Sequence, residues 1–85
     1  MAYFAYILEC ADGTFYSGST NDLEKRLHKH NHLKSGAHYT KIRRPVVLKY
    51  SEEVPDFATA RAREAEFKRW SRDEKIKFLS QTKKK

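Results

Sequence analysis

The chain has few of the features that mark secreted, disulfide-bonded or membrane proteins. It contains one cysteine, Cys10, so it cannot form an internal disulfide, and a fold held together by disulfides is excluded. A lone thiol indicates a reducing, cytoplasmic setting, in which we expect Cys10 to be a small buried apolar residue. No apolar run approaches the length of a membrane span, and no signal peptide is visible at the start of the sequence.

Size and charge indicate one small basic domain. The 85 residues, 13% of them aromatic, suffice for a single compact core. Lys and Arg number 18 against 11 Asp and Glu, which gives a formal net charge of +7. Such a balance is typical of proteins that meet polyanions, although it also serves solubility. We expect one domain over residues 1–82 and a disordered basic tail over 83–85.

Local sequence patterns predict six secondary-structure elements. Aromatic and β-branched residues mark the strands, and capping side chains followed by apolar residues at helical spacing mark the helices. The expected strands are 3–9, 14–18 and 46–50, and the expected helices are about 22–31, about 57–69 and a segment after Ser71. The order ββαβαα favours an α/β fold in which a small three-stranded sheet is packed with helices.

The turn between the first two strands decides where two tyrosines point. If Gly13 takes the left-handed conformation of a three-residue turn, Leu8 pairs with Tyr16 and Tyr6 pairs with Gly18. Tyr6 and Tyr16 then lie on one face of the sheet as diagonal neighbours. A two-residue turn would instead send the two side chains to opposite faces.

Capping residues locate the helix starts. Asn21 and Glu24 form a box-like pattern before the first helix, Asp56 can cap the second, and Ser71 with Glu74 forms a capping box for the third. On that third helix we expect the core-facing residues to be Ile76, Phe78 and Leu79.

The first helix carries an arginine on its packing face. The spacing i, i+3, i+4, i+7 places on one face Leu23, Arg26, Leu27 and His30. A buried charge costs several kcal/mol unless it is paired or hydrated. Arg26 is therefore either a solvated helix residue or a functional one.

Taken in order, these segments resemble the GIY-YIG endonuclease family. That family has a Gly-Ile-Tyr strand, a Tyr-Ile-Gly strand about ten residues on, a helix with a catalytic arginine, and a later helix with a metal-binding glutamate. The matching segments here are Phe4-Ala5-Tyr6, Tyr16-Ser17-Gly18, Arg26 within 21–27 followed by His30, and Glu64 within 62–68. The resemblance covers essentially residues 3–80 and is strongest to short stand-alone bacterial members.

Some positions depart from the family pattern. The first motif keeps its tyrosine alone, and Ser17 replaces the isoleucine of the second motif. Many members also have an asparagine after the glutamate helix, and this chain has none beyond Asn31. The changed motif positions pack the backbone, whereas the tyrosines, the arginine and the glutamate are all present.

The resemblance implies metal-dependent hydrolysis of DNA phosphodiester bonds, in repair or processing. It assigns Glu64 to Mg²⁺ or Mn²⁺, since a hard dication suits carboxylate and phosphate oxygens. Tyr6 would accept a proton from the attacking water, with its pKa lowered from about 10 by the cation and Arg26. Tyr16 would orient the water or the phosphate, and Arg26 would hold the non-bridging oxygens. His30 would position the phosphate or assist proton transfer.

Each of these residues also has a purely structural interpretation. Tyr6 and Tyr16 suit a half-buried sheet, and Glu64 can pair with Lys68 at i, i+4. The functional alternative is a non-catalytic nucleic-acid-binding module that keeps the fold. In such a module unpaired bases would stack on sheet aromatics such as Tyr3, Phe4 or Tyr16.

A basic segment before the third strand is expected to contact the phosphate backbone, through Lys41, Arg43 and Arg44. Because the chain has no room for a separate DNA-binding domain, we expect weak intrinsic activity or a protein partner that delivers the substrate. His28 and His32 have the i, i+4 spacing of helical zinc sites, but no third ligand is evident, so zinc is not favoured.

Overall fold

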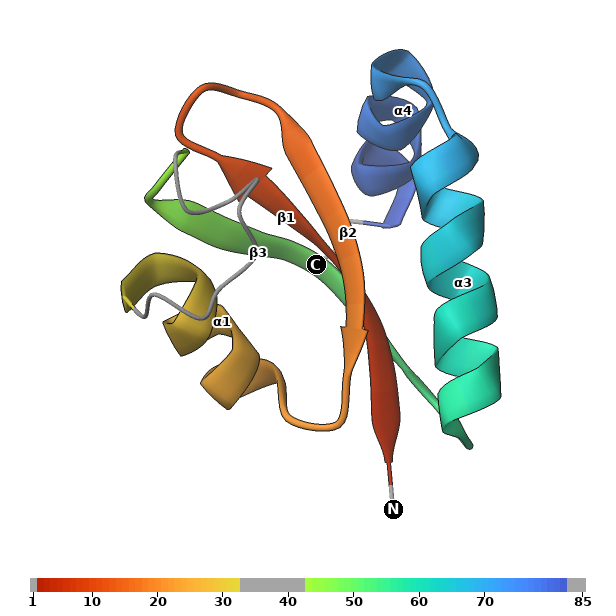
Figure 1. Ribbon diagram of the computed structural model, residues 1–85. Helices are drawn as coiled ribbons and strands as arrows, with labels where there is room; N and C mark the ends of the chain where they lie inside the picture. The colour runs from red at the N-terminus through yellow and green to blue at the C-terminus, as the bar shows by residue number, and fades with distance from the viewer. Residues whose placement is uncertain (1, 33–42, 83–85) are drawn as a thin grey trace.

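A three-stranded antiparallel sheet carries helices on both of its faces (Figure 1). The computed structural model describes residues 2–32 and 43–82. Its elements are β1 Tyr3–Cys10, β2 Phe15–Thr20, α1 Leu23–His32, β3 Val46–Val54, α3 Phe57–Arg69 and α4 Arg72–Thr82. The strand order is β2-β1-β3, so β1 is central and β2 is an edge strand. The expected ββαβαα order and the three-stranded sheet are confirmed.

The β1–β2 hairpin has the register that brings the two tyrosines together. Gly13 has a φ of 86°, and its N–H donates to the carbonyl of Cys10 at 2.9 Å. This is the left-handed conformation that a three-residue turn requires. Tyr6 consequently pairs with Gly18, and Tyr16 lies two residues away on the same face, as predicted.

Each face of the sheet has its own set of buried side chains, because successive residues of a strand alternate between faces. The face toward α1 buries Tyr6, Leu8, Cys10 and Val46, against which Leu23 and Leu27 pack. The face toward α3 and α4 buries Ala5, Ile7 and Phe67, against which Trp70, Phe78 and Leu79 pack. The thiol of Cys10 is free and buried, as expected.

Two boundaries differ from the sequence prediction. β3 continues to Val54, opposite Tyr3, because it pairs with the whole length of β1 and its exposed residues alternate with half-buried ones. α1 is capped by Asp22 rather than by Asn21, since an oxygen of the Asp22 carboxylate accepts from the N–H of Lys25 at 3.1 Å.

The caps of the last two helices are as predicted, but one core residue is not. Asp56 accepts from the N–H of Thr59 at 2.8 Å, and the N–H of Ser71 donates to Glu74 at 2.7 Å. Ile76, expected in the core, is 41% exposed. Residues two apart on a helix do not share a face, so Ile76 cannot point inward together with Phe78.

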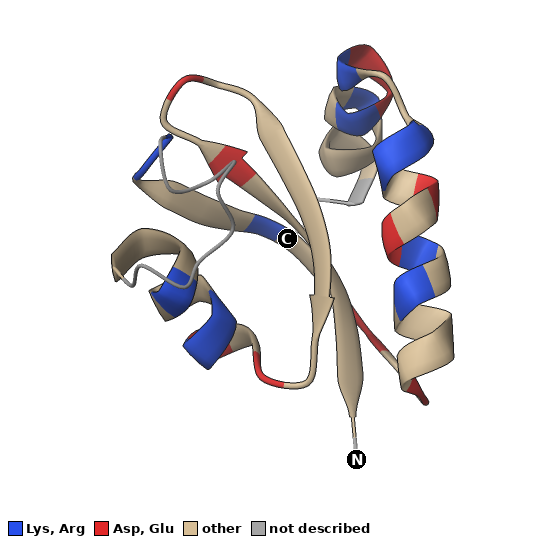
Figure 2. Ribbon diagram, viewed as in Figure 1, with Lys and Arg blue, Asp and Glu red and all other residues tan. Residues whose placement is uncertain are grey.

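Helices α1 and α3 stand on either side of the edge strand β2 (Figure 1). Lys and Arg occur on both of these helices, with acidic residues among those of α3 (Figure 2). None of the helices in the described part of the chain is long and apolar enough to cross a bilayer. A binding site that reaches over β2 would have the basic residues of α1 on one side and the mixed basic and acidic residues of α3 on the other.

Candidate active site

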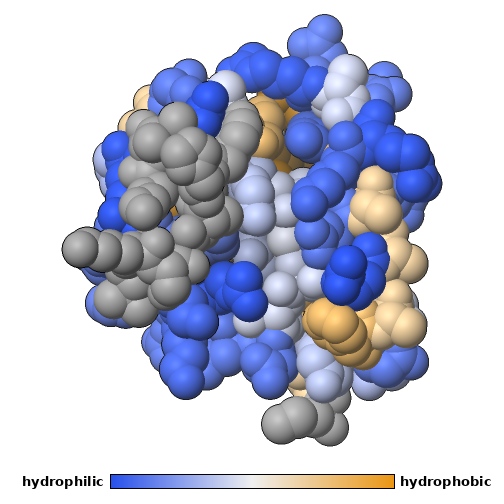
Figure 3. All heavy atoms as spheres, in the orientation of Figure 1, coloured by the Kyte–Doolittle hydropathy of each residue, from blue (hydrophilic) through white to orange (hydrophobic). Residues whose placement is uncertain are grey.

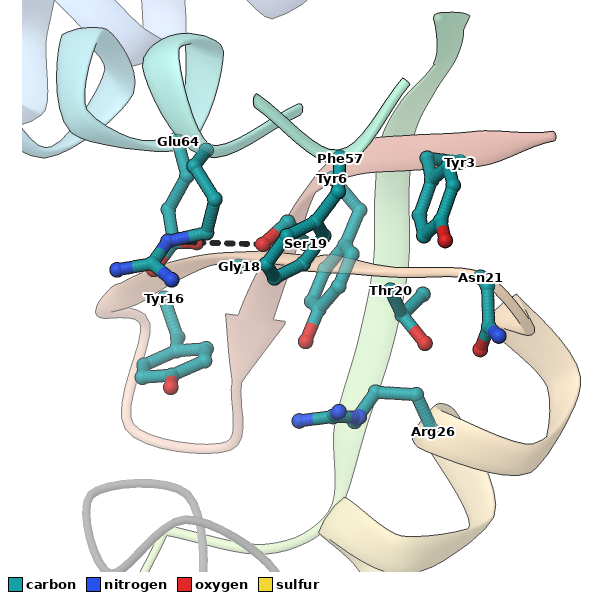
Figure 4. A pocket seen from close by; sticks show the side chains of 11 residues that line it. Tyr3, Tyr6, Tyr16, Gly18, Ser19, Thr20, Asn21, Arg26, Phe57 and Glu64 are labelled. Carbon is teal, nitrogen blue, oxygen red and sulfur yellow. Dashed lines mark hydrogen bonds and ion pairs between the residues drawn. The ribbon is translucent and has the colours of Figure 1, made fainter. Parts of the chain in front are cut away.

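A cavity of about 490 Å³ reaches across β2 between α1 and α3. Its lining includes Tyr6 from β1, Tyr16 from β2, Arg26 from α1 and Glu64 from α3 (Figure 4). The same face of the molecule is hollowed between the two helices (Figure 3). Four of the five residues singled out from the sequence as catalytic or metal-binding therefore converge on one concave site, although they come from four different elements, whereas the fifth, His30, is buried and does not line the cavity.

The glycine of the second motif makes room for Tyr6. A Cβ atom at Gly18 would overlap the hydroxyl oxygen and the Cζ atom of Tyr6. The Tyr6 ring is 2% exposed and lies over the backbone of β2 at this point. Gly18 is thus required by the close approach of a catalytic candidate to the edge strand.

Tyr6 and His30 form a buried hydrogen-bonded pair. The distance from Tyr6 Oη to His30 Nε2 is 3.1 Å, and His30 is 1% exposed. Burial raises the pKa of Tyr6 above its ordinary value, and the opposing charge of Arg26 does not offset it. Burial together with the charges of Arg26 and Arg44 lowers the pKa of His30 to about 4. At neutral pH Tyr6 is therefore a phenol beside a neutral imidazole.

This protonation state changes the expected role of Tyr6. A phenolate base at Tyr6 would require a lowered pKa, and Arg26 does act in that direction. Burial has the larger effect in this site, so the phenolate is not the resting form. In the tautomer that carries its proton on Nδ1, His30 can accept the phenol proton at Nε2.

Tyr16 lies between the two helices that border the cavity. Its ring centroid is 5.2 Å from that of His30, with the planes at 63°. On the other side, the Nζ atom of Lys68 lies 5.9 Å from the centroid of the Tyr16 ring. The Tyr16 side chain therefore contacts both the α1 and the α3 sides of the site.

Glu64 is half-buried and held by three neighbours. Its Oε1 accepts a hydrogen bond from Ser19 Oγ at 2.7 Å, and its Oε2 lies 2.9 Å from Lys68 Nζ (Figure 4). Arg61 Nε is 3.9 Å from Oε1. Burial opposes ionisation, but the hydrogen bonds from Lys68 and Ser19 more than offset it and leave the pKa of Glu64 below its ordinary value. Glu64 is therefore ionised at neutral pH.

Arg26 lies on the packing face of α1, but its charge is not fully buried because the side chain extends toward the cavity. Its side chain is half-buried, and its guanidinium points toward the hydroxyl end of Tyr6 (Figure 4). Leu23 and Leu27, on either side of it along the helix, pack against the core. Arg26 is thus presented to the site by α1.

The basic residues before β3 contact other parts of the fold. Arg43 Nε lies 3.0 Å from Asp12 Oδ2 in the hairpin turn. The guanidinium of Arg44 donates to the carbonyl oxygens of Lys29 and His30, in the last turn of α1. Lys41 lies outside the described residues. The expected contact of these three residues with phosphate stays a prediction.

Sequence reasoning missed several residues that complete the site. Ser19 orients Glu64 from 45 positions away in the sequence, and no local pattern marks such a contact. Lys68 was considered as a helix-surface partner of Glu64, yet it also approaches Tyr16. The α3 spacing i, i+4 was the available signal for Lys68, whereas the local sequence carries no signal for Ser19.

Possible metal ligands are few in this site. In residues 2–32 and 43–82, no group of three or more His, Cys, Asp or Glu side chains is arranged to hold a metal ion. The rings of His28 and His32 lie 4.8 Å apart at the end of α1, and no third ligand joins them in that part of the chain. Among the described residues that line the cavity, Glu64 supplies the carboxylate.

Comparison with known proteins places this chain in a family. A family model described as the GIY-YIG catalytic domain matches residues 2–77. A UPF0213 protein from Syntrophus aciditrophicus is 49% identical over 78 residues, which cover 92% of this chain and 90% of that protein. A UPF0213 protein from Staphylococcus saprophyticus is 47% identical over 79 residues, which cover 93% of this chain and 95% of that protein.

Two structures determined by solution NMR share the fold. A UPF0213 protein from Bacillus halodurans matches with a TM-score of 0.61 and 38% identity, over 96% of this chain and 86% of that one. A protein from E. faecalis matches with a TM-score of 0.64 and 36% identity, over 95% of this chain and 85% of that one. The family model and these relatives each span nearly the whole sequence, and the chain therefore belongs to the GIY-YIG family.

Proposed function

We propose that the protein is a divalent-metal-dependent endonuclease that hydrolyses phosphodiester bonds of DNA in the cytoplasm, in repair or processing. The GIY-YIG family implies endonuclease-type activity. The observation that carries the proposal is the meeting of Tyr6, Tyr16, Arg26 and Glu64 around one cavity. Basic residues on both helices beside that cavity, and the formal net charge of +7, suit a polyanionic substrate.

Glu64 fits a site for Mg²⁺ or Mn²⁺. Mg²⁺ is commonly held in proteins by one or two carboxylates, with waters and substrate phosphates completing its coordination. Glu64 is ionised and faces the cavity, and each carboxylate oxygen can accept more than one interaction. Its partner Lys68 has a side chain that is 52% exposed and can turn away. A dication bound there would neutralise charge on the phosphate that is attacked.

Arg26 would hold the phosphate. Its planar guanidinium can donate two parallel hydrogen bonds to non-bridging oxygens, which fixes the position of the phosphate as well as neutralising it. Tyr6 lies directly across the cavity from it, so a phosphate on Arg26 sits within reach of the Tyr6 hydroxyl. Tyr16, between α1 and α3, would orient the attacking water or the same phosphate.

Tyr6 and His30 would carry away the proton of the attacking water. The water gives a proton to Tyr6 Oη while Tyr6 passes its own proton to His30 Nε2, which becomes an imidazolium. The charge of Arg26 contributes to the low pKa of His30. A phosphate bound at Arg26 opposes that charge, so substrate binding would make His30 a better proton acceptor. This route needs no phenolate in the free protein.

One observation favours a second candidate, a nucleic-acid-binding module without catalysis. Both oxygens of Glu64 already have partners, in Ser19 and Lys68, as they would in a purely structural ion pair. In that case the basic surface would serve binding alone. Activity and binding must therefore be measured together.

Cleavage of end-labelled single-stranded, duplex and branched DNA in Mg²⁺, Mn²⁺ or EDTA tests the proposal. We expect cleavage with either metal and none in EDTA, with binding kept in all three conditions. A protein partner that supplies the substrate would appear as weak cleavage that rises when cell extract is added. Binding without cleavage in any metal would favour the module and contradict the endonuclease.

A further inference from the structure

Two aromatic rings line the cavity beside Tyr6, with Tyr3 at the end away from Tyr16 and Phe57 between Tyr3 and Glu64 (Figure 4). Tyr3 begins β1 and Phe57 begins α3, and both line the cavity. Their ring centroids are 5.5 Å apart with the planes tilted by 52°. The rings thus form a continuous aromatic surface beside the residues proposed to bind phosphate.

The core does not account for this aromatic surface. Phe57 is 47% exposed and lies outside both clusters of buried side chains in the described residues. A single exposed apolar residue is common on proteins and carries no meaning by itself. This one, however, belongs to the wall of the candidate active site, and a hydrophobic patch borders the hollow in Figure 3.

A cation lies next to the aromatic surface. The guanidinium carbon of Arg61 is 5.5 Å from the centroid of the Phe57 ring, and the Arg61 side chain is 62% exposed. Arg61 also lines the cavity. Aromatic rings bordered by positive charge are what single-stranded nucleic acid requires, because bases stack on the rings while the cation neutralises the backbone.

The spacing along β1 suits a nucleotide. Tyr3 and Tyr6 are three residues apart on β1, about 10 Å at the usual rise per residue, and although their side chains leave opposite faces of the strand, both line the cavity. A phosphate held beside Tyr6 therefore leaves the base of an adjoining nucleotide within reach of Tyr3 and Phe57. A base inside a duplex has both of its faces covered by its neighbours, so an unpaired base alone could use this surface.

We propose that Tyr3 and Phe57 form a subsite on which an unpaired nucleobase stacks next to the phosphate to be cleaved. The inference rests on the proposed function and narrows its substrate to DNA that is single-stranded or locally unpaired. Every base has a π-face, so the subsite selects for the absence of pairing rather than for sequence. Arg61 neutralises the backbone of the stacked nucleotide.

Binding of 2-aminopurine oligonucleotides in EDTA tests the subsite. The full chain is titrated into a single-stranded probe and into a hairpin duplex of the same sequence, and both anisotropy and 2-aminopurine quenching are followed. Phe57→Ala should weaken binding of the single strand by about 5- to 100-fold and abolish quenching, with duplex binding unchanged. Phe57→Trp should keep both signals. Val47→Ala serves as the matched control, because Val47 is 56% exposed on β3 and does not line the cavity.

The outcomes separate the subsite from the proposed function. If the wild type binds the single strand and Phe57→Ala binds it equally well, the subsite is wrong and the proposed function stands. Equal losses for single strand and duplex would also overturn the subsite, since stacking on an unpaired base cannot explain them. If the wild type binds neither probe, the proposed function fails and the subsite fails with it. Thermal unfolding of each variant is measured as well, to check that the exposed side chain can be removed without loss of the fold.

Discussion

On the face of the sheet covered by α3 and α4 the interior is apolar and aromatic, whereas the face covered by α1 buries a tyrosine and a histidine. The first face stacks rings at centroid distances between 4.9 and 6.1 Å, from Tyr50, Phe67, Trp70 and Phe78. The second holds the Tyr6–His30 hydrogen bond, with Arg26 at its opening. Burial stabilises the fold on one side, and on the other it tunes the pKa of two groups.

The division between the faces explains how 85 residues can carry both a core and a reactive site. Burying polar groups lowers stability unless they are hydrogen-bonded, so the α1 face contributes less to folding than its buried area suggests. The aromatic rings buried on the opposite face supply the folding stability that the α1 face lacks. Glu64 joins the two sides, because it extends from α3 over the edge strand to the cavity.

The largest expected effect is a loss of stability on the structural face, which is the face of the sheet covered by α3 and α4. Phe67 is fully buried and contacts Tyr50, Trp70 and Phe78. Phe67→Ala should lower the free energy of unfolding by about 3–5 kcal/mol, measured by urea denaturation. Cleavage per folded molecule should stay near the wild-type value at low temperature. A loss of less than about 1 kcal/mol would contradict the assignment of this face as the main source of stability.

The buried histidine should make stability depend on pH. Burial, Arg26 and Arg44 hold the pKa of His30 at about 4 in the folded state, against 6.5 for an ordinary histidine. The unfolded chain therefore takes up the proton first as pH falls. The part of the folding stability that depends on neutral His30 is complete above pH 6.5. It is lost as pH falls toward 4, by about 3 kcal/mol in total.

His30→Gln isolates this contribution. The pH slope of the unfolding free energy between 6.5 and 5 should be shallower in His30→Gln than in the wild type. Identical slopes in the wild type and His30→Gln would show that His30 is not held neutral by burial.

A smaller effect concerns a polar side chain, that of Ser17, buried on the structural face. Ser17 is 2% exposed, and its hydroxyl has no hydrogen-bond partner in the described part of the chain. Ser17→Ala should raise the free energy of unfolding by about 1 kcal/mol, because it removes an unsatisfied buried group. Ser19→Ala should not stabilise the protein, since the Ser19 hydroxyl donates to Glu64. A less stable Ser17→Ala variant would mean that the hydroxyl is satisfied after all.

The smallest expected effect concerns metal binding. Lys68 pairs with the carboxylate that would bind the cation. Lys68→Gln should tighten Mn²⁺ binding by about 2- to 5-fold, as expected when one partly exposed ion pair no longer competes. Electron paramagnetic resonance of free Mn²⁺, without DNA, measures this. Lys77→Gln, on α4, is the control. Equal Mn²⁺ affinity in the wild type and both variants would show that Lys68 does not compete with the metal for Glu64.

Sequence patterns predict the parts of this protein that depend on neighbouring residues. The capping carboxylate of Asp56 located α3, and the turn glycine Gly13 decided the hairpin register. The sequence prediction was wrong for one core residue of α4. Ile76 is exposed because α4 turns Phe78 and Leu79 to the sheet. Helical periodicity excludes Ile76 and Phe78 from facing the core together, but tertiary packing decides which of the two does so.

The candidate site divides in the same way. The spacing of the motifs and the family resemblance were enough to name Tyr6, Tyr16, Arg26 and Glu64. The contacts that set their chemistry join distant segments, since Tyr6 and His30 are 24 positions apart and Ser19 and Glu64 are 45 apart. The high pKa of Tyr6 could not be predicted either, because it results from burial under α1.

The central claim is that Arg26 and Glu64, from opposite sides of the sheet, act on one phosphate. Single-turnover cleavage by Arg26→Gln, Glu64→Gln and the double variant tests it most directly, with Glu66→Gln as the control on the same helix. Each single change should slow cleavage by about 10²–10³-fold with little change in stability. The double variant should be hardly slower than either one, as for residues that act as a unit. Losses that multiply, or a Glu66→Gln variant as slow as Glu64→Gln, would contradict a shared site.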